Sequence, residues 1–193
     1  MAKIHVPYSK TGMDLNIEDK NLLKVLTSKA HDFKPAKSES QLVEDSMDNP
    51  IGSKKLEELA VGKKNIVIIT SDHTRPVPSK VTMPIILRRI RSVNKDAKIK
   101  ILIANGFHRP TTKEELIFKM GEEIVENEEI VMHISTDDSQ MVKAGVLPSG
   151  GDFYLNKVAF EADLLIAEGF IEPHFFAGFS GGRKSILPGI ASA

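Results

Sequence analysis

The chain has 193 residues, 41% hydrophobic and 27% charged, so it can bury a core of its own as one domain or as part of a larger one. Lysine and arginine number 26, as do aspartate and glutamate, so no positive excess predicts binding to nucleic acid or to an anionic membrane surface. The absence of cysteine excludes disulfides and thiolate metal sites, and no apolar stretch approaches the roughly 18 residues of a membrane span, so we expect a cytoplasmic location.

Residues 1–60 are expected to form a lead-in to the main domain. The runs 3–8 and 13–17 alternate in polarity around a Ser-Lys-Thr-Gly turn, which predicts a β-hairpin that covers an edge of the main sheet. Short helices are expected after it, over residues 21–29, 38–47 and 54–60. None of these elements carries residues that indicate chemistry.

From Lys64 onward, strand and helix patterns alternate. Apolar, β-branched runs at residues 65–70, 98–104, 129–134 and 162–167 predict strands buried on both faces. Helices are expected between them, and residues 139–160 are expected to be an irregular or hairpin insertion. Residues 61–193 therefore predict an α/β fold, an open and mostly parallel sheet with helices on both faces, similar to the Rossmann fold.

The helices between these strands have recognisable ends. Thr111 or Thr112 is expected to cap the helix before Gly121, which stops it. The helix over residues 79–93 should turn its isoleucines inward and its arginines outward, including Arg89, and Pro84 either kinks it or marks its start.

Polar side chains follow several of these strands at the point where each strand ends. Asp72, His73, Thr74 and Arg75 follow the first strand, His108 and Arg109 follow the second, and His174 follows the fourth. Because the carboxyl ends of parallel strands meet at one edge of a sheet, where open α/β sheets bind ligands, these clusters predict a binding site.

The stretch from residue 168 to 189 combines His174 with a glycine-rich bend and an Arg-Lys pair. Gly178, Gly181 and Gly182 can take backbone angles closed to other residues and so turn N–H groups toward an anion. A nucleotide P-loop is excluded, because Arg183 stands where that motif requires glycine. Two interpretations remain: a solvated basic loop, or a lysine, Lys184, used as a nucleophile or covalent tether.

The residue types at this edge suit acid and base chemistry. Two histidines can act as acid and base on opposite faces of a substrate, and Arg75 offers a planar donor pair for a carboxylate or phosphate. Asp72 could orient the arginine or a histidine, or it could only close a local turn. A zinc site formed by His73, His108 and His174 is a further alternative, although these residues lack the close helical spacing of common metal motifs.

Three motifs resemble those of a known family. SDHTRPVP at 71–78, ANGFHRPTT at 104–112 and EPHFFAGFSGGRKSILPGI at 172–190 look like the N-terminal motifs of the nickel-dependent lactate racemases. The resemblance implies a nickel-pincer nucleotide, a pyridinium mononucleotide with two thiocarboxyl groups, tethered to Lys184. It implies that His108 and His174 exchange protons with a 2-hydroxy acid whose hydride passes reversibly to the cofactor. Asp72, His73, Thr74 and Arg75 would lie against the cofactor and substrate.

The resemblance also sets expectations about the length of the enzyme. The family's metal-binding histidine and its second domain lie beyond the position that corresponds to Ala193, so no metal ligand is expected in this chain. We expect an N-terminal catalytic and cofactor domain, inactive alone, whose partners are a 2-hydroxy acid and the C-terminal domain of the same enzyme. The alternative function is a non-catalytic domain that binds an anion or nucleotide through the glycine bend and Arg75.

Overall fold

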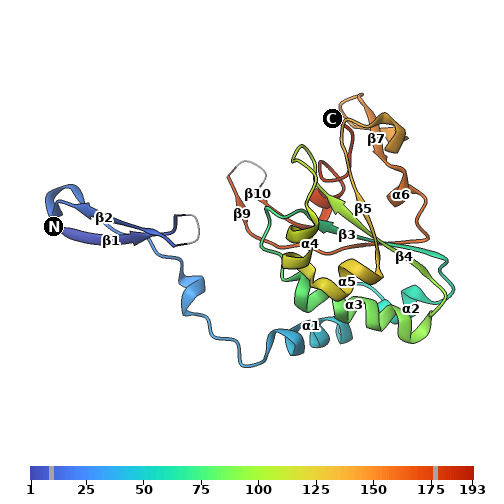
Figure 1. Cartoon of the computed structure of the whole chain (residues 1–193), viewed down its shortest axis with the longest axis horizontal. Helices are drawn as coiled ribbons and strands as arrows, with labels where there is room; N and C mark the ends of the chain where they lie inside the picture. Colours follow the sequence, from blue (N-terminus) through green and yellow to red (C-terminus); the bar gives the residue numbers. More distant parts are fainter. Residues whose placement is uncertain (9–10, 176–177) are drawn as a thin grey trace. The chain divides into compact units, whose positions relative to one another are not determined.

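A computed structural model describes residues 1–8, 11–175 and 178–193, which form two compact units, Met1–Ala36 and Lys37–Ala193 (Figure 1). The first unit contains the predicted hairpin, in which β1 (Ala2–Val6) and β2 (Met13–Ile17) pair antiparallel as a sheet of their own. Half of the predicted Ser-Lys-Thr-Gly turn, residues 9 and 10, lies outside the described residues.

The helix predicted over residues 21–29 is wrong. Among its described residues, 1–8 and 11–36, the only helices are two short 3-10 helices, η1 (Asp19–Asn21) and η2 (Lys29–Asp32), with an irregular segment between them. Leu23 and Leu26 in that segment are 102% and 84% exposed. A short helix depends on packing of its apolar face, and these side chains have no such packing in the unit.

The second unit is built on a four-stranded parallel sheet, as predicted. Its strands are β3 (Asn65–Ser71), β4 (Lys98–Ala104), β5 (Glu129–Met132) and β8 (Leu164–Ala167), in the spatial order β5-β4-β3-β8. The chain runs from β3 to β5 in one direction and then returns to place β8 on the other side of β3. This reversal beside β3 is the kind of switch point at which open α/β sheets bind ligands.

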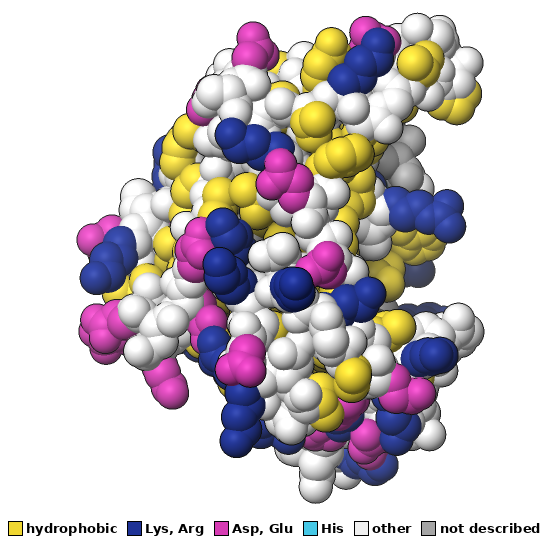
Figure 2. Space-filling view, turned by 90° about the vertical axis from the view of Figure 1, so that its right-hand side faces the viewer, with side chains coloured by type: hydrophobic (Ala, Val, Ile, Leu, Met, Phe, Trp, Pro, Cys, Tyr) yellow, Lys and Arg dark blue, Asp and Glu magenta, His cyan; other side chains and the backbone are white. Residues whose placement is uncertain are grey.

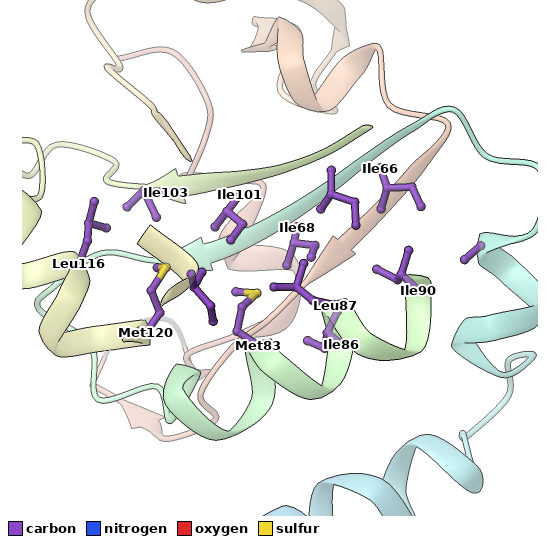
Figure 3. Packing of buried hydrophobic residues seen from close by; sticks show 13 residues of the cluster. Ile66, Ile68, Met83, Ile86, Leu87, Ile90, Ile101, Ile103, Leu116 and Met120 are labelled. Atoms are coloured by element: carbon purple, nitrogen blue, oxygen red, sulfur yellow. The ribbon is translucent and has the colours of Figure 1, made fainter. Parts of the chain in front are cut away.

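One face of the sheet is covered by helices. These are α3 (Ser79–Val93), α4 (Lys113–Met120) and α5 (Glu122–Asn127), and Figure 3 shows Ile66, Ile68, Ile101 and Ile103 of the sheet facing Met83, Leu87 and Ile90 of α3. Two more helices, α1 (Glu39–Asp48) and α2 (Leu56–Ala60), pack on α3. The interdigitated isoleucines of β3 and β4 make this the main core.

The opposite face is covered mainly by a hairpin and short helical turns (Figure 1). The hairpin strands are β6 (Met141–Val146) and β7 (Asp152–Asn156), preceded by η3 (Asp138–Gln140) and followed by α6 (Lys157–Phe160). Val67, Ile69 and Leu102 of the sheet pack against Leu155 and Ile190. The predicted insertion at 139–160 is thus a hairpin that contributes to the core.

The helix ends follow the sequence signals. Thr112, not Thr111, caps α4 by accepting a hydrogen bond from the Glu115 N–H, and Gly121 ends the helix with a φ of 92°. Helix α3 begins at Ser79, so Pro84 does not mark its start.

The predicted outward orientation of Arg89 is wrong. Its side chain is 7% exposed and forms ion pairs with Glu44 and Asp48 of α1 and Glu57 of α2. The hydrogen bonds that this guanidinium donates, first to Asp48 and then to Glu44, raise its pKa despite its burial. The sequence of α3 alone could not reveal this, because the three carboxylates come from other helices.

The surface has the mixed charge that equal numbers of acidic and basic residues predict. Figure 2 shows lysine, arginine, aspartate and glutamate side chains interspersed over one face, without a large area of one sign. Within the described part of the chain, no helix combines the length and the apolar character needed to cross a membrane.

Candidate functional site

A cleft of about 420 Å³ lies at the carboxyl edge of the sheet, where β3, β4 and β8 end. It brings together five of the predicted site residues, which are Asp72, Arg75, His108, His174 and Lys184. The other residues of its wall come from the loop after β4 and from the glycine-rich segment, and include Asn105, Gly106, Phe107, Ser180, Gly181, Ser185 and Gly189. Residues more than 100 positions apart in sequence thus share one cavity.

Asp72 and His108 form a hydrogen-bonded pair in the wall of this cleft. The Asp72 carboxylate is 2% exposed, and it accepts hydrogen bonds from the Thr74 N–H at 3.0 Å, the Thr74 hydroxyl at 2.6 Å and His108 Nδ1 at 2.5 Å. Burial favours the neutral acid, but the hydrogen bonds from Thr74 and His108 outweigh it and lower the pKa of Asp72. An ionised Asp72 assigns the proton to Nδ1 of His108, which leaves Nε2 as the nitrogen able to exchange a proton with a bound molecule.

His174 lines the cleft from the other side of β3. It belongs to β9 (Pro173–His174), which pairs with β10 (Gly178–Phe179), and its ring stacks on Phe175 at a centroid distance of 5.1 Å. His108 follows β4 and His174 follows β8, and these strands flank β3. The two imidazoles therefore approach the cleft from segments on either side of Asp72.

The segment that carries Lys184 is held by a tight bend. Gly181 has a φ of 79°, and a Cβ there would lie 2.9 Å from the Phe170 carbonyl oxygen, so only glycine fits. The Ser180 hydroxyl donates to that same carbonyl at 2.6 Å and accepts from the Glu172 N–H at 3.0 Å. Gly178, Gly181 and Gly182 all take positive φ, and η4 (Gly182–Ser185) follows the bend and lines the cleft with Lys184 and Ser185.

The Lys184 amine lines the cleft and is half-buried, and within the described ranges it makes no hydrogen bond or ion pair. The Gly106 N–H donates to the Gly189 carbonyl at 3.1 Å, which ties the lysine segment to the loop that carries His108. An unpaired amine beside an arginine, two histidines and a glycine bend fits an anionic group bound through a covalent tether.

His73 lies outside the cleft. Its Nδ1 is 3.2 Å from the Thr111 hydroxyl and 3.8 Å from Glu115, in a neighbouring groove also lined by Phe118. Hydrogen bonds from Arg109 and the Thr112 backbone lower the pKa of Glu115 to about 2. Thr74 also lines this groove, but its hydroxyl reaches Asp72.

The zinc alternative has no support in this geometry. Among the residues that the structure describes, no three histidine, aspartate or glutamate side chains form a group that could hold a metal ion. His73 turns away from the cleft that His108 and His174 share.

Glu168 is a part of the site region that the sequence analysis missed. It directly follows β8 and is 6% exposed, and it accepts hydrogen bonds from the hydroxyls of Thr70 at 2.5 Å, Ser79 at 2.7 Å and Thr82. These contacts fix the start of the segment that leads to His174. A glutamate directly after an apolar strand and before Gly169 was the available signal.

Comparison with known proteins gives the family. A family model described as the lactate racemase N-terminal domain matches residues 8–193. The chain is 66% identical over 192 residues to a lactate racemase of Lactiplantibacillus plantarum and 58% identical to one of Thermoanaerobacterium thermosaccharolyticum. Both alignments cover all of this chain and 45% of the relative, so the chain spans less than half the length of these curated relatives.

Solved structures agree with these matches. The apoprotein of the lactate racemase from T. thermosaccharolyticum superimposes with a TM-score of 0.87 at 57% identity, over 99% of this chain and 44% of that one. A Thermotoga maritima protein superimposes with a TM-score of 0.60 at 26% identity, over 75% of this chain and 40% of that one. The chain therefore belongs to the lactate racemase N-terminal domain family.

Proposed function

We propose that this chain is the cofactor-binding and proton-transferring part of an enzyme that racemises lactate or a related 2-hydroxy acid. The observation that carries the proposal is the convergence of His108, His174 and Lys184 on one cleft at the switch point of the sheet. The similarity to two lactate racemases over the whole chain supports the reaction class.

The two histidines would act as acid and base. Loss of a hydride from the 2-hydroxy acid also requires a base for its hydroxyl proton. Because either enantiomer must react, one histidine would serve the hydroxyl of each enantiomer, and imidazole is available in both protonation states near neutral pH. The hydrogen bond from His108 Nδ1 to Asp72 orients one ring for this role. Arg75 in the same cleft offers its guanidinium to the substrate carboxylate.

The residues of the cleft fit the family's nickel-pincer nucleotide. Lys184 would hold it through a thiocarboxyl group, and the bend at Gly181 and Gly182 would give the anionic nucleotide close access to the backbone. When bound, this group supplies the acceptor for the hydride of the 2-hydroxy acid. Asp72 and Arg75 would lie beside it, and Thr74 would act through Asp72.

The matched relatives extend well beyond the part that aligns with this chain. The remainder of such a protein would supply the metal-binding histidine and further substrate contacts. We therefore expect the 193-residue chain to be inactive alone, with the C-terminal part of the same enzyme as its partner.

The test uses a version of the protein that has the full length of its relatives, made in cells that also make the cofactor. Racemisation is measured as the loss of optical rotation of L-lactate. His108→Ala and His174→Ala should each reduce the rate in both directions by at least about 10²-fold, the usual contribution of a general base. His5→Ala is the matched control, because His5 is exposed in the N-terminal hairpin. Near-normal rates in either cleft variant would refute the assignment of two bases.

The same experiment distinguishes the alternative function. The positive φ values of Gly178, Gly181 and Gly182 beside Arg75 and Lys184 also suit a domain that only holds an anion or nucleotide. If the cofactor is attached and no 2-hydroxy acid is racemised, only that binding role remains.

A further inference from the structure

Glu168 is a buried carboxylate that has no part in the proposed chemistry. It directly follows β8 and is 6% exposed, and within the described part of the chain it forms no ion pair. Glutamate is almost never buried this completely unless it is paired, because removing a carboxylate from water is costly. An apolar residue of similar shape would fill the space at a lower cost, so packing alone does not explain a glutamate at this position.

Three hydroxyls converge on the two oxygens of Glu168. Thr70 and Ser79 both donate to Oε2, at 2.5 Å and 2.7 Å, and Thr82 donates to Oε1. Thr70 lies near the end of β3, whereas Ser79 and Thr82 belong to the first turn of α3. An ionised carboxylate suits this arrangement, because both of its oxygens act only as acceptors and its hydrogen bonds are roughly twice as strong as those between neutral groups.

Thr70 and Ser79 stand on either side of the loop that carries Asp72 and Arg75. Within this loop, the Arg75 N–H donates to the Asp72 carbonyl at 3.3 Å and the Val77 N–H donates to the Arg75 carbonyl at 2.9 Å. The loop is therefore held internally by its own backbone. The hydrogen bonds of Thr70 and Ser79 to one carboxylate oxygen then fix where the two ends of the loop lie.

Glu168 also begins the segment that leads to His174. Its own N–H donates to the Ile69 carbonyl at 2.8 Å, which continues the pairing of β8 with β3 by one residue. A Cβ on the next residue, Gly169, would lie 3.4 Å from the Cα of Gly181, so the backbone here runs against the glycine bend. The side chain and backbone of Glu168 therefore join the loop after β3 to the segment that carries the second histidine.

We propose that Glu168 is a positioning residue that sets the separation between the loop of Asp72 and Arg75 and the segment of His174. The inference rests on the proposed function, in which groups on these two segments must face the same bound 2-hydroxy acid. A misplacement of about 1 Å can cost about 10²-fold in rate, so the two segments need a rigid connection. Glu168 does not line the cleft itself, so it provides this connection without touching the substrate.

The proposal is tested by amide hydrogen exchange of the 193-residue chain without cofactor or substrate, followed by NMR. Thr70 is fully buried; Thr70→Val keeps the shape of its side chain and removes the hydroxyl, whereas Thr70→Ser keeps the hydroxyl and removes a methyl group. In Thr70→Val, we expect the amides of Arg75 and Val77 to exchange at least about tenfold faster relative to the amides of β4. In Thr70→Ser they should exchange at nearly the wild-type rate. A purely structural role predicts the opposite order, because valine fills the site and serine leaves a cavity.

A second variant acts on the carboxylate and decides the matter if Thr70→Val fails to fold. Glu168→Gln replaces one acceptor oxygen with an amide nitrogen and should loosen both segments, so the amides of Val77 and Glu172 should exchange at least about tenfold faster relative to β4. Glu161→Gln, at an exposed position, is the matched control and should change neither amide. Unchanged exchange in Glu168→Gln, or faster exchange in Thr70→Ser than in Thr70→Val, would overturn the proposal.

These readouts do not depend on catalysis, so they separate this inference from the proposed function. If a version of the protein with the full length of its relatives racemises lactate, Glu168→Gln should lower its kcat by about 10-fold to 100-fold and change its KM much less. If that protein has no activity, the differences in exchange are still expected, because they arise from hydrogen bonds within this chain. If it is active and the exchange rates do not change, the proposed function stands and the positioning role is wrong.

Discussion

Replacement of Asp72 by asparagine tests how much the buried carboxylate in the wall of the cleft stabilises the fold. The carboxylate accepts three hydrogen bonds, two from Thr74 and one from His108. An amide oxygen can keep the Thr74 bonds in weaker, neutral form but loses the bond to the imidazole. One charge-assisted hydrogen bond contributes about 1.5–3 kcal/mol, and each weakened bond loses a fraction of that. Asp72→Asn should therefore lower the free energy of unfolding by about 2–4 kcal/mol. The melting temperature should fall by about 5–12 °C.

The assay is urea unfolding followed by circular dichroism at several pH values, with Asp14→Asn in the exposed hairpin as the control. Because the pKa of Asp72 is lowered in the folded protein, its stabilisation is complete above the unfolded value near 3.8 and is lost as the pH falls below it. The difference in the free energy of unfolding between wild type and Asp72→Asn should therefore disappear below about pH 4. A difference in the free energy of unfolding under about 0.5 kcal/mol at pH 7, or a difference that persists in acid, would refute the reasoning.

Three further predictions concern stability, each measured by thermal or urea unfolding. Gly181→Ala should cost about 1–3 kcal/mol or more because of its positive φ and a 2.9 Å approach to backbone, whereas Gly151→Ala, with its nearest neighbour at 3.9 Å, should be nearly neutral. Ile68→Ala should cost about 2–5 kcal/mol because the side chain is fully buried, and the exposed Ile51→Ala should cost almost nothing; equal effects would contradict the core assignment. Burial lowers the pKa of His133, so stability should fall as the pH drops below about 6.5, and His133→Gln should flatten that dependence.

The parallel sheet could be predicted because its strands are unbroken apolar runs. Residues 65–70 and 98–104 alternate with helices that have clear caps and stops, and the structure places β3 and β4 within a residue of these limits. The order of the strands was not in the sequence, because parallel pairing joins segments far apart in the chain. The cleft nevertheless followed from one general rule, that polar residues after parallel strands meet at one edge.

The errors have a common physical cause, which is that contacts between distant segments override local pattern. Arg89 is on the polar side of α3 in a helical projection, yet carboxylates of α1 and α2 surround it. The pattern at residues 21–29 suggested a helix, but its apolar side chains Leu23, Val25 and Leu26 are exposed. His73 shares a motif with Asp72 but lies in another groove, where its ring contacts Thr111, a residue from the loop after β4.

Lys119 and Glu168 could not have been identified from sequence. Lys119 fits the exposed charge pattern of a short helix, and only the fold shows that it is 8% exposed and that its amine has no hydrogen-bond partner among the described residues. Glu168 was included in the glycine-rich stretch without a role of its own. The hydroxyls that hold Glu168 come from β3 and α3, about 90 or more residues earlier in the chain, so no local motif encodes these contacts.

The most direct test of the proposed tether is the intact mass of a version of the protein that has the full length of its relatives. This protein would be made in cells that also make the cofactor. The proposed tether predicts an added mass on the wild-type chain that is absent from Lys184→Ala and also from Lys184→Arg, because a guanidinium stays protonated and cannot form the bond. Arg183→Ala, which changes the exposed neighbour, should keep the adduct. An added mass that survived both changes at Lys184 would contradict the account and place the tether at another residue.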